Sequence, residues 1–239
     1  MTTHYRDLSN STAGTTAVRS HSYADKADSG VGRAPAATGL YRTLGKRFFD
    51  IVLVLLSAPF IVFFVGVLAL FVARDGGRPF YSQKRVGKNG HIYTMWKMRS
   101  MVIDADERLE QHLMRIPAAR VEWDSTQKLK CDPRITAFGH FLRRSSMDEL
   151  PQLWNVLIGD MSLVGPRPMM PCQRNLYSGT DYYDLRPGIT GSWQVSARNE
   201  STFAARAEFD AQYNAELSAM TDIRLLLATV RVVMRGTGH

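Results

Sequence analysis

The chain of 239 residues is long enough for one domain with its own core, and we interpret it as one domain with a membrane anchor. Thirty basic residues against 22 acidic ones leave a net charge of +8, which favours anionic partners such as lipid head groups or phosphorylated ligands. Nucleic acid is disfavoured because no helix-turn-helix, zinc-finger or RNA-binding signature occurs, and the widely separated Cys131 and Cys172 exclude a disulfide framework and a metal knuckle.

The first segment, residues 1–40, is rich in Ser, Thr, Ala and Gly and has no apolar periodicity. Such a segment cannot bury enough surface to offset its chain entropy, so we predict a disordered N-terminal tail. The start of the chain also lacks the apolar core and the small-residue cleavage site of a signal peptide.

An uncharged apolar run extends from Ile51 to Ala73. As a straight helix it would measure about 34 Å, which is enough to cross a bilayer core, so a transmembrane span is the simplest interpretation. Two features argue against a plain span: Pro59 near the middle removes a helical hydrogen bond, and cations flank both ends without giving a clear orientation. We predict a membrane-inserted helical anchor over residues 46–78.

Two short β-prone runs follow, Pro79–Gln83 and Ile92–Trp96, and the turn between them contains glycine and asparagine. This pattern predicts a β-hairpin. Lys97 and Arg99 come next, on one face if the strand continues. Such charges are ordinarily solvated, but a basic hairpin beside a membrane segment could equally contact head groups or a nucleotide diphosphate.

Two helices are predicted before the central motif. Asp104–Arg115 has an acidic start and apolar residues four apart, which is typical of a surface helix that ends before Pro117. After a turn at Asp132-Pro133-Arg134, a second helix carries Phe138, Phe141 and Leu142 and leads to Arg143.

Two adjacent carboxylates, Asp148 and Glu149, form the central motif. They precede apolar residues spaced as one face of a helix, namely Leu150, Leu153, Trp154 and Leu157. We therefore place both acids in the first turn of this helix, where the positive end of the helix dipole favours anions. The simpler alternative is a capping box between Ser146 and Glu149. Arg143 before the pair and Arg167 after the helix favour phosphoryl chemistry, because guanidinium groups bind phosphates.

The rest of the chain supplies two stiff segments and two helices. Gly165–Pro171 contains three prolines and Arg167, and Arg186–Gln194 is punctuated by glycines that could let the backbone approach a phosphate or sugar. Helices are predicted at Phe203–Leu217, which belongs to the core, and at Asp222–Arg235. The last helix has an apolar side and arginines, which suits either a membrane surface or docking on the domain.

Three of these stretches together resemble the bacterial polyprenyl-phosphate phosphoglycosyl transferases: LRRSSMDELPQ at 142–152, GDMSLVGPRP at 159–168 and RPGITG at 186–191. The similarity extends from about Lys46 to about Arg235. It implies an α+β, mainly helical fold, with a re-entrant helix-break-helix anchor that enters one membrane leaflet and returns. It also implies a small cytosolic catalytic domain over residues 79–239, with a β-hairpin and amphipathic helices at the membrane surface, among them the C-terminal helix.

The resemblance also implies the reaction. A sugar 1-phosphate, with galactose as the expected sugar and glucose next, passes from a UDP-sugar to undecaprenyl phosphate and UMP is released, as the first membrane step of exopolysaccharide biosynthesis. The first acid, Asp148, matches the family nucleophile that would carry a covalent phosphosugar, and Glu149 would bind Mg²⁺, a hard cation that prefers carboxylate and phosphate oxygens. Arg143 and Arg167 match phosphate-binding arginines, and Asp222 aligns loosely with a further metal-binding acid.

The expected partners are therefore a UDP-sugar, undecaprenyl phosphate and membrane lipids at the cytoplasmic face of the bacterial inner membrane, with Lys97 and Arg99 as further phosphate-binding candidates and no nucleic acid. The oligomeric state is open, with a homodimer as one alternative. A different class of function is a non-catalytic membrane scaffold of a polysaccharide assembly system. The presence of both Asp148 and Glu149 favours the enzyme, because a scaffold has no need to keep the pair.

Overall fold

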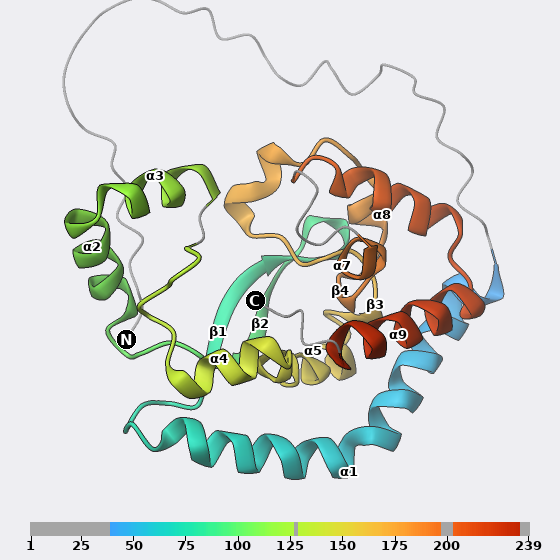
Figure 1. Cartoon of the computed structure of the whole chain (residues 1–239). Helices are drawn as coiled ribbons and strands as arrows, with labels where there is room; N and C mark the ends of the chain where they lie inside the picture. The colour runs from blue at the N-terminus through green and yellow to red at the C-terminus, as the bar shows by residue number, and fades with distance from the viewer. Residues whose placement is uncertain (1–38, 127–128, 197–202, 235–239) are drawn as a thin grey trace, which may run out of the picture. The chain divides into compact units, whose positions relative to one another are not determined.

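The computed structural model describes residues 39–126, 129–196 and 203–234, so almost all of the predicted tail lies outside the described residues (Figure 1). The two longest helices are α1 (Lys46–Ala73), preceded by a π-helical turn at Tyr41–Gly45, and α9 (Ala219–Met234). The other helices are α2 (Ala105–Arg115), α3 (Pro117–Thr126), α4 (Ala137–Arg144), α5 (Gln152–Ile158), α6 (Asp181–Asp184), α7 (Ser192–Ser196) and α8 (Arg206–Ala215). The four described strands are β1 (Phe80–Val86), β2 (Ile92–Met98), β3 (Ser162–Val164) and β4 (Gly188–Thr190). The predicted mainly helical α+β architecture is confirmed.

The predicted hairpin is confirmed as β1 paired antiparallel with β2, in a register that runs from Phe80 opposite Met98 to Val86 opposite Ile92. The chain reverses through a 3₁₀ turn at Lys88–Gly90, where Asn89 and Gly90 have φ values of 57° and 76°. Asparagine and glycine adopt this left-handed conformation at low cost, which is why this turn forms here. The hairpin carries Lys97 at its far end.

A second sheet was not predicted. It consists of β3 paired parallel with β4, three residues each, which is too short for a period-two pattern. The backbones at Gly165 and Gly188 approach so closely that a Cβ on either glycine would collide with backbone atoms of the facing segment. The two glycines thus fix the loop that carries Arg167 against the segment 186–191.

The predicted break in the membrane helix is corrected by the structure, because α1 continues through Pro59 without interruption. Figure 1 shows that this helix bends instead, so that its first and second arms run in different directions. Ser57 lies just before Pro59 and donates its hydroxyl to the Leu53 carbonyl at 2.8 Å, a bond that commonly bends helices. A missing proline N–H and a back-bonded serine together account for a bend at this point.

Both arms of α1 pack on the rest of the fold. Val54 of the first arm joins a core cluster with Tyr93 and Val156, and Val72 of the second arm joins one with Met98. The ends are also bonded, since the Lys46 ammonium donates to the buried carboxylate of Asp222 at 2.7 Å and the Val72 carbonyl accepts from Arg99 at 2.9 Å.

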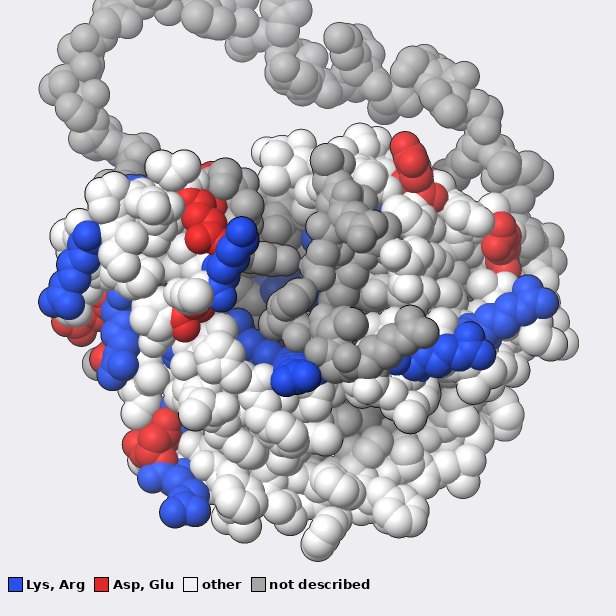
Figure 2. Space-filling model, in the orientation of Figure 1, with Lys and Arg blue, Asp and Glu red and all other residues white. Residues whose placement is uncertain are grey.

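The outer side of α1 is apolar and exposed. Tyr41–Ala73 is the one helical stretch among the described residues that is long and apolar enough to cross a membrane, and only 11% of its most apolar window is buried. A core helix of a soluble protein would be mostly buried. Figure 2 shows the part of the surface that α1 occupies in Figure 1 almost without charged side chains. Large exposed apolar side chains continue onto neighbouring helices: Phe141 on α4, Trp154 and Ile158 on α5, and Ile223, Leu227 and Val230 on α9.

Candidate active site

The carboxylate pair lies at the junction of α4 and α5. The Ser145 hydroxyl bonds back to the Phe141 carbonyl at 2.7 Å where α4 ends, and Ser146 then adopts a left-handed conformation with φ of 56°. A 3₁₀ turn, Met147–Glu149, follows this reversal and precedes α5. The acids therefore lie before the first turn of the helix and not in it. Ser146 makes no side-chain cap bond, so the capping-box alternative is wrong.

Lys97 at the end of β2 contacts both acids. Its ammonium lies 2.8 Å from Glu149 Oε1 and 3.7 Å from Asp148 Oδ2. Asp148 is 9% exposed, and burial raises the pKa of its carboxyl above the ordinary value, although the charges of Lys97 and Arg143 oppose the rise. The site thus holds a desolvated carboxylate beside fixed cations, an environment in which a bound cation or the loss of water strongly changes reactivity.

Arg143 supports the pair from the last turn of α4. Its Nε donates to the Ser100 hydroxyl at 2.8 Å, and burial lowers the pKa of the guanidinium while Asp148 and Asp132 counteract this. Gly139 makes the approach possible, because a Cβ there would collide with the Ser100 carbonyl. The structure thus brings Arg143 and Lys97 to the acids; the sequence predicted this position for Arg143, whereas for Lys97 it offered only a possible phosphate contact.

A cavity of about 440 Å³ opens beside the acids and is mainly apolar. Glu149 and Arg167 lie at its polar part, while the rest of its wall comes from the bend of α1, β4 and α9, with Phe60, Ile61, Phe64, Ile189, Thr229, Val232 and Val233 among the lining residues. A smaller cavity of about 30 Å³ shares Glu149 and Arg167 with it and is lined by Arg85 and Lys97. Glu149, which follows Asp148 in the chain, therefore lies where an apolar cavity meets a cation-lined one.

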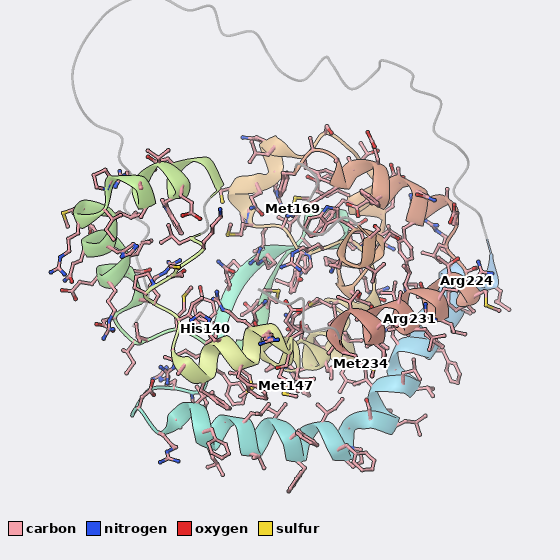
Figure 3. The ribbon with its side chains drawn as sticks, viewed as in Figure 1. His140, Met147, Met169, Arg224, Arg231 and Met234 are labelled. Carbon is pink, nitrogen blue, oxygen red and sulfur yellow. The ribbon has the colours of Figure 1, made fainter. Side chains whose placement is uncertain are left out.

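Met147 lies between α4 and α1 in Figure 3, and it packs with Leu68 and Val72 beneath the acid pair. Arg224 and Arg231 lie along α9 in the same view, both exposed. Arg235, which the sequence placed on this helix, lies outside the described residues.

Arg99 has partners elsewhere. Its guanidinium binds the Asp75 carboxylate and donates to the Val72 carbonyl, so it caps the C-terminal end of α1. This is a helix-capping contact, which supplies a reason for the arginine without any substrate. The predicted phosphate-binding role of Arg99 therefore has no support from its placement.

Asp222 is also used elsewhere. It is fully buried, and its two oxygens accept from Lys46 at 2.7 Å, Tyr41 at 2.6 Å and Tyr213 at 2.6 Å. A carboxylate with three donors has little capacity left for a metal ion. The placement of Asp222 thus argues against its predicted metal-binding role.

The remaining metal candidates are the two adjacent acids. Among the described residues no group of three or more His, Cys, Asp or Glu side chains could hold a metal ion. Mg²⁺ is commonly bound by only one or two carboxylates together with water and substrate phosphates. Asp148 and Glu149 fit that mode, in which the substrate completes the site.

Two cavity-lining residues belong to segments that the sequence analysis noted, but neither was predicted as a site residue. Arg85 lies on β1, and Gln194 lies on α7. A lone arginine in a strand and a glutamine in a short helix carry no local signal, because their position beside the acids depends on how the hairpin and the β3–β4 sheet pack.

The similarities of this sequence to known proteins all lead to one family. The sequence profile of the bacterial sugar transferases matches residues 41–236. The UDP-galactose-lipid carrier transferase of Erwinia amylovora is 47% identical over 195 residues, and the undecaprenyl-phosphate galactose phosphotransferase of Salmonella typhimurium is 45% identical over 199 residues. Each alignment covers 81% of this chain but 41% of the relative, so the chain spans less than half the length of these two proteins. The exopolysaccharide production protein ExoY of Rhizobium meliloti is 40% identical over 213 residues, which cover 85% of this chain and 93% of the relative.

Proposed function

The chain belongs to the bacterial sugar transferase family, and from this premise we propose that it transfers a sugar 1-phosphate from a UDP-sugar to undecaprenyl phosphate, with release of UMP. This would be the first membrane step of exopolysaccharide biosynthesis. The observation that carries the proposal is the position of Glu149, the neighbour of Asp148 in the chain, in the walls of both an apolar cavity and a cation-lined one. A transferase that moves a sugar phosphate from a charged nucleotide to a lipid phosphate needs an apolar and a polar environment beside its reacting groups.

The chemistry proceeds in two displacements. An oxygen of the Asp148 carboxylate attacks the phosphorus that bears the sugar; a new O–P bond forms and the P–O bond to the nucleotide breaks, so that its electron pair leaves with UMP. An oxygen of undecaprenyl phosphate then attacks the same phosphorus, and the electron pair of the acyl phosphate bond returns to the carboxylate. Lys97 and Arg143 offset the anionic charge of the phosphoryl group in both steps. Neither step requires a proton transfer.

Mg²⁺, when bound, would supply charge neutralisation at the phosphates, and Glu149 with Asp148 would hold it. Lys97 contacts Glu149 at 2.8 Å, so the two cations would compete for this carboxylate unless the lysine turns towards a phosphate. We therefore expect chelation with EDTA to abolish activity, Mg²⁺ to restore it, and Glu149→Gln to lose activity as metal removal does.

The lipid substrate would enter through the apolar cavity, whose wall is formed by the bend of α1. Both arms of α1 pack on the same fold, which favours an anchor that enters one leaflet and returns over one that spans the bilayer. Arg224 and Arg231 on α9 would lie at the head groups, with the exposed apolar side chains of that helix in the bilayer. Neither substrate would need to cross the membrane, because the nucleotide sugar arrives from the cytosol.

The test is to incubate the purified full chain with undecaprenyl phosphate, Mg²⁺ and a panel of UDP-sugars and to measure UMP. We expect release with one sugar preferred, and galactose is the first candidate because relatives carry it in their names. Radiolabelled sugar should also remain on the protein when the lipid phosphate is omitted. If no UDP-sugar yields UMP, the transferase proposal is wrong, and the alternative of a non-catalytic membrane scaffold gains support. UMP release with no labelled protein would refute only the covalent step.

A further inference from the structure

Three arginines converge beside the active site in a way that the sequence did not suggest. The Arg206 guanidinium at the start of α8 lies over the Trp193 ring at 4.2 Å, and that of Arg167 lies over the same ring at 5.8 Å. Arg85 of β1 donates to the Pro168 carbonyl at 3.1 Å, directly after Arg167 in the chain. We call Arg85, Arg167 and Arg206 the arginine cluster.

No carboxylate of the described residues forms an ion pair with the arginine cluster. In the same part of the chain, the buried Nε atoms of Arg85 and Arg206 have no hydrogen-bond partner. Burial and the charge of Arg167 lower the pKa of Arg206 to about 10 and also lower that of Arg85. Buried like charges with unpaired N–H groups are costly unless an anion completes the arrangement.

The carboxylate that influences Arg206 most is a poor substitute for such an anion. Asp210 accepts a hydrogen bond from the Tyr177 hydroxyl at 2.8 Å, and burial raises the pKa of its carboxyl to about 7. A carboxyl that titrates near neutral pH supplies at most part of a negative charge. Within the part of the chain that the structure describes, the arginine cluster therefore lacks a full counter-charge, which an external anion would supply.

The position of the arginine cluster indicates which anion. Arg85 and Arg167 line the small polar cavity together with Lys97 and Glu149. Arg206 is not among the lining residues of either cavity, and it adjoins Arg167 across the Trp193 ring. Lys97 and Arg143 lie at the Asp148 carboxylate, where the phosphorus that bears the sugar would react. A nucleoside diphosphate has a second phosphate one bridging oxygen away, which the arginine cluster can bind.

We propose that Arg85, Arg167 and Arg206 bind the nucleotide phosphate that departs from the reacting phosphorus. This inference rests on the proposed function. When the P–O bond to the nucleotide breaks, the bridging oxygen keeps the electron pair and negative charge grows on UMP; the arginine cluster stabilises that charge. Arg206, which the sequence analysis did not single out, thereby acts in the first displacement but not in the second, because UMP has left by then.

The two displacements can be measured separately, which gives a sharp test with Arg206→Gln. We expect UMP to bind this variant at least about tenfold more weakly than the wild type in calorimetric titration, as the loss of a charged hydrogen bond implies. Label from UDP-sugar should accumulate on Asp148 at least about tenfold more slowly, while transfer of label already on the protein to undecaprenyl phosphate should change less than about threefold. Arg120→Gln removes the same charge from an exposed position on α3 and should change neither rate.

Arg206 also packs on Trp193 and Phe203, so the glutamine variant could unfold. Arg206→Lys keeps the positive charge and most of the aliphatic stem but loses the planar fork, and it should still weaken UMP binding. In the wild-type protein, UMP should protect Arg206 from phenylglyoxal, as mapped by peptide mass, and leave Arg120 reactive.

Unchanged UMP affinity in folded Arg206→Gln and Arg206→Lys, or an equal slowing of both displacements, would overturn the inference. If the wild type still releases UMP from a UDP-sugar in that case, the proposed function stands without it. If the wild type releases no UMP from any UDP-sugar but binds UMP through Arg206, the transferase proposal fails and the nucleotide-phosphate site remains.

Discussion

Two lysine–carboxylate sites in this protein use the same residue types to opposite effect. At the first, Asp222 is fully buried and accepts hydrogen bonds from Lys46, Tyr41 and Tyr213 at 2.6–2.7 Å. At the second, Asp148 lies 3.7 Å from Lys97, which is closer to Glu149. The Asp222 carboxylate has its bonding capacity filled, whereas the Asp148 carboxylate has capacity left for a ligand.

This difference separates a structural ion pair from a reactive one. A filled carboxylate fixes two helices, since Lys46 begins α1 and Asp222 lies in the first turn of α9. An unfilled one is destabilised by burial, as the raised pKa of the Asp148 carboxyl shows, and gains from a cation or from bond formation to phosphorus. The residue types alone do not distinguish the two sites, but the number of hydrogen-bond donors does.

The largest expected effect comes from replacing the unfilled carboxylate. Asp148→Asn should lower turnover at least about a thousandfold, roughly 4 kcal/mol of transition-state stabilisation, because an amide cannot attack phosphorus. Its thermal midpoint should stay the same or rise, since burial disfavours the charge that is removed. Initial rates of UMP release and a thermal melt of the same sample measure both, with exposed Asp106→Asn as the control. Retention of more than about a tenth of wild-type turnover would contradict the nucleophile assignment.

The converse prediction concerns Asp222, whose replacement should lower stability and leave turnover unchanged. Asp222→Asn should cost about 3–5 kcal/mol of stability, because it leaves the Lys46 ammonium buried without its counter-charge. Turnover per folded molecule should change little at temperatures below the melting transition. Thermal melting and rate measurements at low temperature separate the two effects, and Asp124→Asn on the exposed face of α3 supplies the matched control. A loss of turnover without a loss of stability would mean that Asp222 has the metal-binding role first predicted.

A third carboxylate lies between these extremes. Asp210 is buried with one hydroxyl donor, Tyr177, and burial raises the pKa of its carboxyl to about 7 against an ordinary value near 4. Between these pH values the folded state keeps a proton that the unfolded state has lost, so the free energy of unfolding falls as pH rises. The stability that the protonated Asp210 carboxyl contributes is lost once the pH exceeds about 7. From pH 5 to pH 8 the wild type should lose roughly 3 kcal/mol relative to Asp210→Asn. Melting of the two proteins across this range measures the difference, and parallel curves would show that Asp210 does not titrate there.

The sequence predicted those elements whose cause is local. The hairpin follows from Asn89 and Gly90 at the turn, and α2 and α4 follow from apolar spacing. The acid pair and Arg143 were identified because the motif stretches are long, whereas Lys97 was noted only as a basic residue of the hairpin. Elements held by distant contacts were missed: β3 and β4 are too short to show a pattern, and no local rule reveals that Arg99 caps α1 or that Tyr41 and Tyr213 fill the carboxylate of Asp222.

The predicted apolar face of α5 is confirmed for Leu150, Leu153 and Leu157, which pack against core clusters, but not for Trp154. Trp154, predicted to face the core, is 58% exposed, whereas Asn155 is fully buried. The Asn155 amide binds the backbone of β2, accepting from Trp96 N at 3.1 Å and donating to the Thr94 carbonyl at 2.7 Å. Periodicity assigns apolar residues to the interior because it assumes water outside, and that assumption fails beside a membrane.

The bond between Lys46 and Asp222 joins positions 176 residues apart, and it limits how this protein can be made. α1 is synthesised before α9, so its first turn finds its counter-charge only when α9 has been synthesised. Chaperone protection or early insertion into lipid must cover that interval, because α1 exposes phenylalanines that no later packing hides. A soluble enzyme cannot be obtained by cutting the chain after α1, since Tyr93, Met98 and Val156 would lose the core neighbours that the helix supplies.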